Sequence, residues 1–482
     1  MDIIRVGLDF GTHQTKICVQ RIPDEGHGEP VYEFFTFKDL EGKEQYVLPS
    51  LVQVNDDDTL SYGFVNAKRE KDFCDRPKLV RIENHDPQLD IEEYADALYD
   101  KYATTDNTSD DICYLIKMLT IRDKKLHVEN ENRKKAAREE YEMKLKDYDS
   151  NCNLYRYFKQ ATFARREWNK IIDSLTLSIW YLAYVIFLLE EKYGTSFSIN
   201  MGIPADDKLY TEKKRLAVEI LLTAYNLVEE VYNNDMNSFL SETVEELKKK
   251  TKYIWYSDEK KYEYNINIFP EAYASLISLT SKGKLAAGMS LTADIGGGTT
   301  DISFFTISDG RPNLYRYWSI PRGLNFIAEQ SGFDYADGDF VEKVNQEIID
   351  EYNIDKKGIV SKLIQDLVGK LRKETNVAVT NLYAALKNRT LVYTGGGSIY
   401  PFLTETIIDF TDVKLINEKM WKEEHIINKT KVVPMCQILT TAYGLSIGES
   451  DEDVKLSDYV TLFDGLPRKM ERSDNYVDKD MC

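Results

Sequence analysis

The chain has 482 residues, more than one average domain, and this length suits two lobes that each bury a core of their own. Its formal net charge of −19 argues against nucleic acid as the main partner and against docking on an anionic membrane. Six scattered cysteines without a CxxC pair argue against a disulfide framework or a zinc site, and they predict reduced thiols in a cytoplasmic protein.

The first predicted element is a β-hairpin around a glycine turn, in VGLDFGTHQTKICV (residues 6–19). One apolar run ends on Asp9, the turn contains Gly11, and a second run follows Thr15. The sequence passes from Met1 almost directly into this strand, so we expect no signal peptide.

The next segment is expected to mix short strands with helices. LPSLVQVNDDDTLSYGFVNAK (residues 48–68) predicts a strand at 51–54, an acidic turn, a return strand and a helix near Asn66. Residues 86–120 are expected to be mixed and helical. Residues 124–149 are dense in both charge signs, which predicts a solvated helix projecting from the body; an exposed insertion is favoured over a partner-binding feature.

Helices and one buried strand are predicted for the middle of the chain. LTLSIWYLAYVIFLL (residues 175–189) is shorter than the ~20 residues of a spanning helix and predicts a buried helix. INMGIPADD (residues 199–207) predicts a buried strand that stops at its proline. Residues 208–250 predict a long amphipathic helical region, with Thr243 and Glu246 as a capping box.

A second hairpin is predicted in LTADIGGGTTDISFF (residues 291–305), after a helix that starts in FPEAYASL (residues 269–276) with its proline in the first turn. Its three glycines can take φ > 0 and bring backbone N–H groups close to a bulky anion, and Thr299 and Thr300 add hydroxyl donors. Asp294 would repel a bare phosphate, which predicts Mg²⁺ or its waters between them. An ordinary glycine hairpin is the alternative.

The last third of the chain is predicted to be mainly helical over residues 335–388. LVYTGGGSIYP (residues 391–401) then predicts a third strand and glycine turn that leads into a helix. TAYGLSIG (residues 441–448) predicts a helix of small residues that packs closely on a sheet. The acidic segment 449–482 is expected to be loose.

The two hairpins repeat one pattern, because an acid, a glycine and a threonine recur at the same spacing. This predicts a duplicated fold whose halves grip one polyphosphate from both sides. Neither hairpin has the Gly-Lys-Ser/Thr ending of a P-loop or opens a dinucleotide-binding βαβ unit. The matched positions are Asp9, Gly11 and Thr15 in the first hairpin and Asp294, Gly296 and Thr300 in the second.

In this order the motifs resemble those of the actin-like ATPase superfamily, most closely the nucleotide-binding domain of DnaK-type heat-shock chaperones. VGLDFGTHQT resembles the first phosphate loop, LTADIGGGTTDIS the second, IPADD the end of a core strand, FPEAYASL the Asn-Glu-Pro-Thr-Ala helix and LVYTGGGSIYP the adenosine loop. The resemblance implies an α/β fold with two actin-like lobes, a ribonuclease H-like duplication, and a nucleotide cleft between the lobes. The implied lobe I covers residues 1–288 and is completed by 432–448; it carries a peripheral subdomain with a helical insertion at about 40–165. The implied lobe II covers residues 289–431, with a reduced peripheral subdomain at about 326–360. An acidic tail at 449–482 follows.

The chain also departs from the chaperones. It is shorter between the second phosphate loop and the adenosine loop, and Arg372 and Lys373 are only weak candidates for the basic pair that sandwiches adenine. We expect no substrate-binding domain, because only a short segment follows residue 448. DYVTLFDGLP (residues 458–467) resembles the interdomain linker or is a local apolar cluster, and the cluster is favoured.

The resemblance assigns chemistry to individual residues. Asp9 and Asp294 would hold the waters of a Mg²⁺ that bridges the β- and γ-phosphates. Glu271 is the first candidate to orient or deprotonate the attacking water, and Asp301 is the second. Lys117 would be the catalytic lysine, or else a surface lysine. The predicted catalytic residues are Asp9, Lys117, Glu271, Asp294 and Thr299, and the predicted nucleotide-binding residues are Gly11, Thr12, His13, Gln14, Thr15, Lys16, Gly296, Gly297, Gly298, Thr300, Gly395, Gly396, Gly397 and Ser398.

The implied function is a slow Mg²⁺-dependent ATPase that binds ATP or ADP and acts as a conformational switch on or through an unidentified protein client or regulator. A filament-forming actin-like ATPase is the alternative, and a small-molecule kinase of the same superfamily is the third possibility. We expect a cytoplasmic protein, either a monomer or a nucleotide-dependent oligomer, with no nucleic-acid or membrane partner.

Overall fold

The computed structural model gives a mixed α/β fold, and its described residues cover most of the chain. These residues are 2–454 except 24–27, 66–107, 152, 164–167, 169, 205–208, 281–284, 286–289, 309–310, 321–322, 325–357, 401–403, 405–407, 417–420 and 422–424. The helix predicted near Asn66, most of 86–120, the subdomain predicted at about 326–360 and the helix predicted after residue 401 therefore fall largely or wholly outside them.

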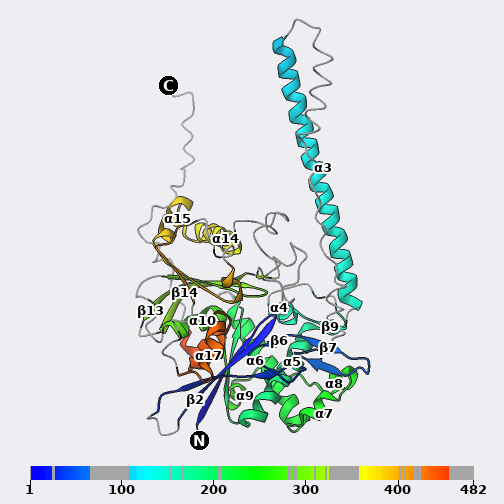
Figure 1. The fold of residues 1–482 in the computed structure, drawn as a ribbon, viewed down its shortest axis with the longest axis vertical. Helices are drawn as coiled ribbons and strands as arrows, with labels where there is room; N and C mark the ends of the chain where they lie inside the picture. Colours follow the sequence, from blue (N-terminus) through cyan, green and yellow to red (C-terminus); the bar gives the residue numbers. More distant parts are fainter. Residues whose placement is uncertain are drawn as a thin grey trace, which may run out of the picture.

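Two mixed sheets form the centre of the molecule, and they repeat one strand order (Figure 1). In each sheet, the first two strands in the chain form an antiparallel hairpin, and the third pairs antiparallel with the second strand of that hairpin. The last two strands lie parallel to the first strand of the hairpin, on its other side. The first sheet runs β11 (Ile266–Pro270), β10 (Ser198–Ile203), β1 (Ile3–Phe10), β2 (Gln14–Ile22) and β3 (Val31–Phe34), with β6 (Leu48–Pro49) on β2; the second runs β16 (Asp412–Leu415), β15 (Thr390–Thr394), β12 (Ser290–Ile295), β13 (Thr300–Ser308) and β14 (Arg311–Ile320).

The two predicted hairpins are confirmed, and they share one register. In the first, Phe10 pairs with Thr15. In the second, Ile295 pairs with Thr300. One residue further from each turn, Asp9 pairs with Lys16 in the first hairpin and Asp294 pairs with Asp301 in the second. The spacing seen in the sequence is therefore a repeated strand pairing.

The other described strands form two smaller sheets. The strand, acidic turn and return strand predicted within residues 48–68 are confirmed, and Asp58 takes a left-handed φ of 61° in that turn. The strands are β4 (Phe37–Lys38) with β5 (Glu44–Gln45), and β8 (Leu60–Tyr62), β7 (Val52–Val54) and β9 (Leu154–Tyr155) in that order.

The helix α3 (Thr108–Asn151) projects from the body, as Figure 1 shows. The side chains described on it are mostly exposed, and several form pairs of opposite charge one turn apart, such as Lys144 with Glu140. The predicted solvated helix is confirmed, and it begins earlier than the predicted residues 124–149.

The most apolar run forms α5 (Ser174–Tyr193), which begins at the N-cap Asp173. Among the described helices, only α5 is long and apolar enough to cross a membrane, but 67% of its apolar window is buried within the protein. Trp180 and Leu182 are completely buried there. The predicted buried helix is confirmed.

The long helical region predicted at 208–250 is interrupted. Asn233 and Asn234 take φ values of 47° and 62°, which a continuing helix does not allow. Thr243 caps the last helix, since its hydroxyl accepts a hydrogen bond from the Glu246 amide at 3.3 Å. The region consists of α6 (Tyr210–Tyr225), a π-helical turn η1 (Asn226–Val231), α7 (Met236–Leu240) and α8 (Val244–Lys250).

Two helices contact both sheets. α10 (Glu271–Thr280) follows β11 of the first sheet but packs against β12, β13 and β14 of the second, and α18 (Cys436–Ile447) packs on β1 and β2. A Cβ on Gly444 would lie 1.8 Å from the Ala274 carbonyl oxygen, so glycine is required where these helices touch. The predicted close packing of the small-residue helix is confirmed, and α10 starts one residue after the proline.

Buried apolar side chains form two clusters, one including β1 and β10 and the other joining the second sheet to α14 (Gly358–Thr375) and α15 (Val379–Lys387). The other helical segments are α4 (Phe158–Phe163), α9 (Asp258–Glu263), η2 (Gly396–Ile399), α17 (Lys429–Val432), η4 (Val433–Met435) and η5 (Asp451–Asp453).

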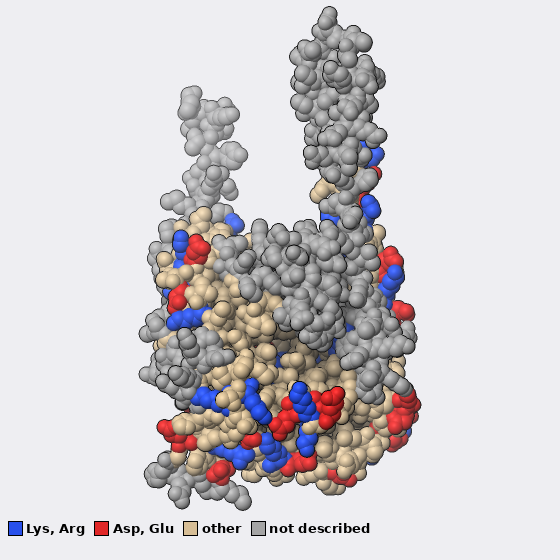
Figure 2. All heavy atoms as spheres, in the orientation of Figure 1, with Lys and Arg blue, Asp and Glu red and all other residues tan. Residues whose placement is uncertain are grey.

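The beginning of the predicted loose tail is fixed on the body, so the prediction is wrong for residues 449–454. Asp451 is 2% exposed and pairs with Lys261 at 2.9 Å and Lys214 at 3.0 Å. Its other carboxylate oxygen accepts from the Ile268 amide at the edge of the first sheet. Elsewhere on the lower part of the face shown in Figure 2, basic and acidic side chains also lie side by side, so their charges offset one another locally.

Candidate functional site

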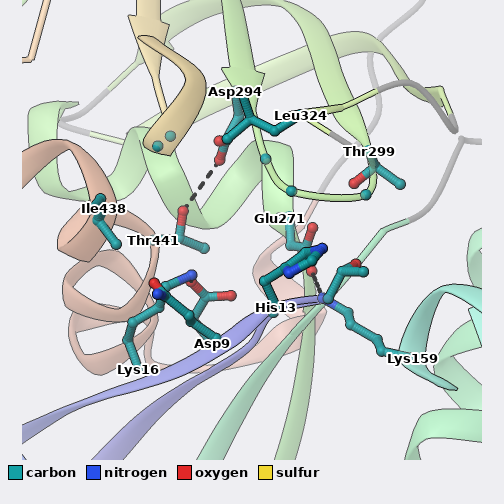
Figure 3. Close-up of a pocket in the computed structure, with 18 of the residues that line it drawn as sticks. Asp9, His13, Lys16, Lys159, Glu271, Asp294, Thr299, Leu324, Ile438 and Thr441 are labelled. Atoms are coloured by element: carbon teal, nitrogen blue, oxygen red, sulfur yellow. Dashed lines mark hydrogen bonds and ion pairs between the residues drawn. The ribbon is translucent and has the colours of Figure 1, made fainter. Parts of the chain in front are cut away.

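A pocket of about 400 Å³ lies between the two hairpin turns. Figure 3 shows Asp9 and Lys16 entering it from the first sheet, and Asp294 and Thr299 from the second. The turns meet at one side of the pocket, where a Cβ on Gly298 would lie 2.6 Å from the Thr12 hydroxyl oxygen. The segments predicted to face one another across a cleft are therefore brought together.

Most of the predicted site residues line this pocket, and so does the second water-orienting candidate, Asp301. Those in contact with it are Asp9, Gly11, Thr12, His13, Gln14, Lys16, Glu271, Asp294, Gly296, Gly297, Gly298, Thr299, Gly395 and Gly396.

Four predicted nucleotide-binding residues do not line the pocket but support its turns. Thr15 and Thr300 are completely buried at the start of the returning strands, as the second residue of β2 and the first of β13, and Thr15 accepts from the Tyr181 hydroxyl at 3.0 Å. Gly397 packs against Ile295, and Ser398 donates to the Gly395 carbonyl at 2.7 Å. The exposed adenine-clamp candidates at the end of α14 are also outside the pocket lining.

The predicted catalytic lysine, Lys117, lies on the projecting helix α3 and is not among the residues that line the pocket. Lys117 precedes the body end of α3 by 34 residues of continuous helix, which at ~1.5 Å per residue is about 50 Å. Lys159, on α4, lines the pocket instead and forms a buried ion pair with Glu271. No local pattern in the sequence marks Lys159, because its partner is 112 residues away.

The short helix α4 reaches both sides of the pocket. Its Gln160 side chain donates a hydrogen bond to the Gly298 carbonyl at 2.9 Å, in the turn of the second sheet. Tyr157, just before α4, takes a left-handed φ of 64° and lies edge-on against His13. Strained non-glycine backbone of this kind is concentrated at functional sites. Sequence reasoning missed α4 entirely.

The pocket carries more carboxylates than cationic side chains: Asp9, Glu271, Asp294 and Asp301 against Lys16, Arg156 and Lys159. Lys16 Nζ lies 3.0 Å from Asp9 Oδ2, and the Lys159 ammonium group pairs with the Glu271 carboxylate. Burial raises the pKa of Asp294 to about 7, with further contributions from Glu271 and Asp9. Burial, then Glu271 and Asp294, hold the pKa of Asp301 well above its usual range. A bound cation would relieve this repulsion.

The donor set suits a magnesium ion that arrives with its ligand. Within the described part of the chain, no group of three or more acidic, histidine or cysteine side chains is arranged to hold a bare metal ion. Magnesium keeps several waters and is commonly held by one or two carboxylates together with substrate phosphates. Asp9 and Asp294, at equivalent positions of the two hairpins, provide two such carboxylates.

No protein-family model matches the sequence, and no curated protein matches it. We therefore infer the function from the geometry and chemistry of the pocket.

Proposed function

We propose that the protein is a Mg²⁺-dependent ATPase of the actin-like superfamily, which binds ATP between its two hairpin turns and hydrolyses it slowly. One observation carries this proposal: two sheets of the same strand order and register direct equivalent glycine turns into one pocket. A duplicated ribonuclease H-like fold would produce this arrangement. A cavity of this size is within the ~300–1,000 Å³ range of small-molecule sites.

The turns have the chemistry to hold phosphate groups. The Gly11 amide donates to the Asp9 carbonyl and the Gly296 amide to the Thr299 carbonyl, which closes each turn on itself. The amides that follow, from Thr12 and Gly297 onward, would donate to the phosphates. The Thr299 hydroxyl, which donates to Asp301 at 3.1 Å, lies at the same end of the pocket.

The carboxylates of the pocket would have two different roles, metal binding and water activation. Asp9 and Asp294 would hold water ligands of magnesium, whose charge would neutralise the phosphates. Glu271 is 8% exposed, and its ion pair with Lys159 fixes it at the pocket. It would orient or deprotonate the attacking water.

Because the pocket is lined by both sheets, a bound nucleotide would also control how closely the two sheets are held together, and the protein would act as a conformational switch. Nucleotide contacts made from both turns would favour the closed arrangement, and loss of the γ-phosphate would weaken one set of them. The protein client or regulator and the cytoplasmic location stay predictions from the sequence.

Magnesium and ATP together should stabilise the protein, whereas magnesium alone should not. At a Mg-ATP concentration of about 100 times Kd the free energy of unfolding should rise by about 2.7 kcal/mol, because the ligand binds only the folded state. Thermal denaturation with Mg-ATP, magnesium alone, and magnesium with adenosine measures this. Equal melting temperatures in all three conditions would contradict the proposal.

A further inference from the structure

α18 presents one face to the first sheet and another to the pocket. On the sheet side, a Cβ on Gly7 of β1 would lie 2.3 Å from the Ala442 carbonyl oxygen, so helix and strand are in close contact. On the pocket side, Ile438 and Thr441 are three residues apart on the same helix face (Figure 3). Residues held by the first sheet therefore reach a pocket that the second sheet also lines.

Thr441 connects this helix to a carboxylate of the other sheet. Its hydroxyl donates a hydrogen bond to Asp294 Oδ2 at 3.2 Å, and the Thr441 side chain is 6% exposed. The second oxygen, Asp294 Oδ1, lies against Gly395, where a Cβ would be 2.3 Å away. Gly395 has a φ of 82° and donates its amide to the Gln437 carbonyl of α18 at 3.2 Å. Contacts organised by α18 thus reach both oxygens of Asp294.

Thr441 departs from the usual behaviour of threonine inside a helix. A helical threonine commonly returns its hydroxyl to the carbonyl four residues earlier. The neighbouring Thr440 does this, with its hydroxyl on the Cys436 carbonyl at 2.5 Å. The Thr441 hydroxyl is directed at Asp294 instead. Two adjacent buried threonines therefore make different bonds, one within the helix and one across the sheets.

We propose that Thr441 is a positioning residue that orients the Asp294 carboxylate toward the magnesium of the bound nucleotide, and does so only while α18 and the second sheet are in contact. The proposal rests on the proposed function. It adds a second element, α18, to the metal-binding end of the site and makes the orientation of Asp294 depend on how the two sheets are held together.

The test compares Mg-ATP affinity with the affinity for ATP in excess EDTA, measured by calorimetry on the full chain. Thr441→Val removes the hydroxyl at nearly constant volume, and loss of a hydrogen bond to a charged group should weaken Mg-ATP binding about tenfold. Affinity for ATP in EDTA should be unchanged. Thr441→Ser should restore Mg-ATP binding, because it restores the donor.

Thr440→Val is the matched control, since it removes a buried hydroxyl from the same helix turn without touching Asp294. It should leave the magnesium dependence unchanged. An equal loss of affinity with and without magnesium in Thr441→Val, or failure of Thr441→Ser to restore binding, would overturn the positioning role. A wild-type protein that binds no Mg-ATP would instead overturn the proposed function itself.

Discussion

Replacing Asp294 with asparagine should stabilise the nucleotide-free protein above pH 7 and, at the same time, remove most of its Mg-ATP binding. Burial, followed by Glu271 and Asp9, raises the pKa of Asp294 in the folded protein to about 7. An aspartate in the unfolded chain has a pKa of about 3.9. The stability that this group contributes is therefore fully present below about pH 4 and is lost as the pH rises through 7.

The size of the effect follows from that difference in pKa. Ionised Asp294 should cost the folded state up to about 4 kcal/mol above pH 7, since each unit of pKa corresponds to about 1.4 kcal/mol. Asp294→Asn cannot ionise, so its free energy of unfolding should exceed that of the wild type at pH 8 and approach it at pH 4. Denaturant unfolding at both pH values, with and without Mg-ATP, measures both effects.

Asp451→Asn is the control for net charge, because it also removes one negative charge. It should destabilise the protein at pH 8, since it leaves Lys261, whose side chain is 6% exposed, without its anionic partner. An Asp294→Asn variant that is no more stable than wild type at pH 8 would contradict the raised pKa of Asp294, and one that keeps the full Mg-ATP stabilisation would contradict the metal-binding role.

Replacing Glu271 with glutamine should reduce ATP turnover by about 10²–10⁴-fold, the usual contribution of general acid–base catalysis, with little change in Mg-ATP affinity. Glutamine keeps an oxygen that can accept from Lys159, so the start of α10 should hold its shape. Single-turnover phosphate release, together with Mg-ATP binding by calorimetry, separates the chemical step from affinity.

Glu246→Gln provides the matched control, because Glu246 is half exposed in α8 and pairs only locally with Lys249. Its turnover should equal that of the wild type. If Glu271→Gln hydrolyses ATP at the wild-type rate while Asp301→Asn does not, the water-orienting role belongs to Asp301, the other carboxylate at that end of the pocket.

The hairpins were predictable because their information is local. Alternating apolar residues define each strand, and the glycines define where it turns, so the pairing of Phe10 with Thr15 and of Ile295 with Thr300 follows from spacing alone. The close packing of α18 on the first sheet was also predictable, since its small residues leave room for a neighbouring backbone: a Cβ on Gly7 of β1 would lie 2.3 Å from the Ala442 carbonyl oxygen.

The parts that were missed depend on contacts between distant segments. Lys159 is a pocket residue only because the fold brings α4 to the start of α10, whereas the sequence resemblance pointed to Lys117. The interruption after α6 depends on left-handed asparagines, and the anchoring of Asp451 depends on two lysines about 190 and 240 residues earlier in the chain. Local propensity does not encode such pairings.

The most direct measurement is a crystal structure of the protein with Mg²⁺ and a non-hydrolysable ATP analogue. The proposal predicts the β- and γ-phosphates between the two hairpin turns, in contact with amides of the Thr12 turn and of Gly297–Thr299, with the metal ion on the side of Asp9 and Asp294. A nucleotide bound elsewhere, with both turns left without phosphate contacts, would contradict it.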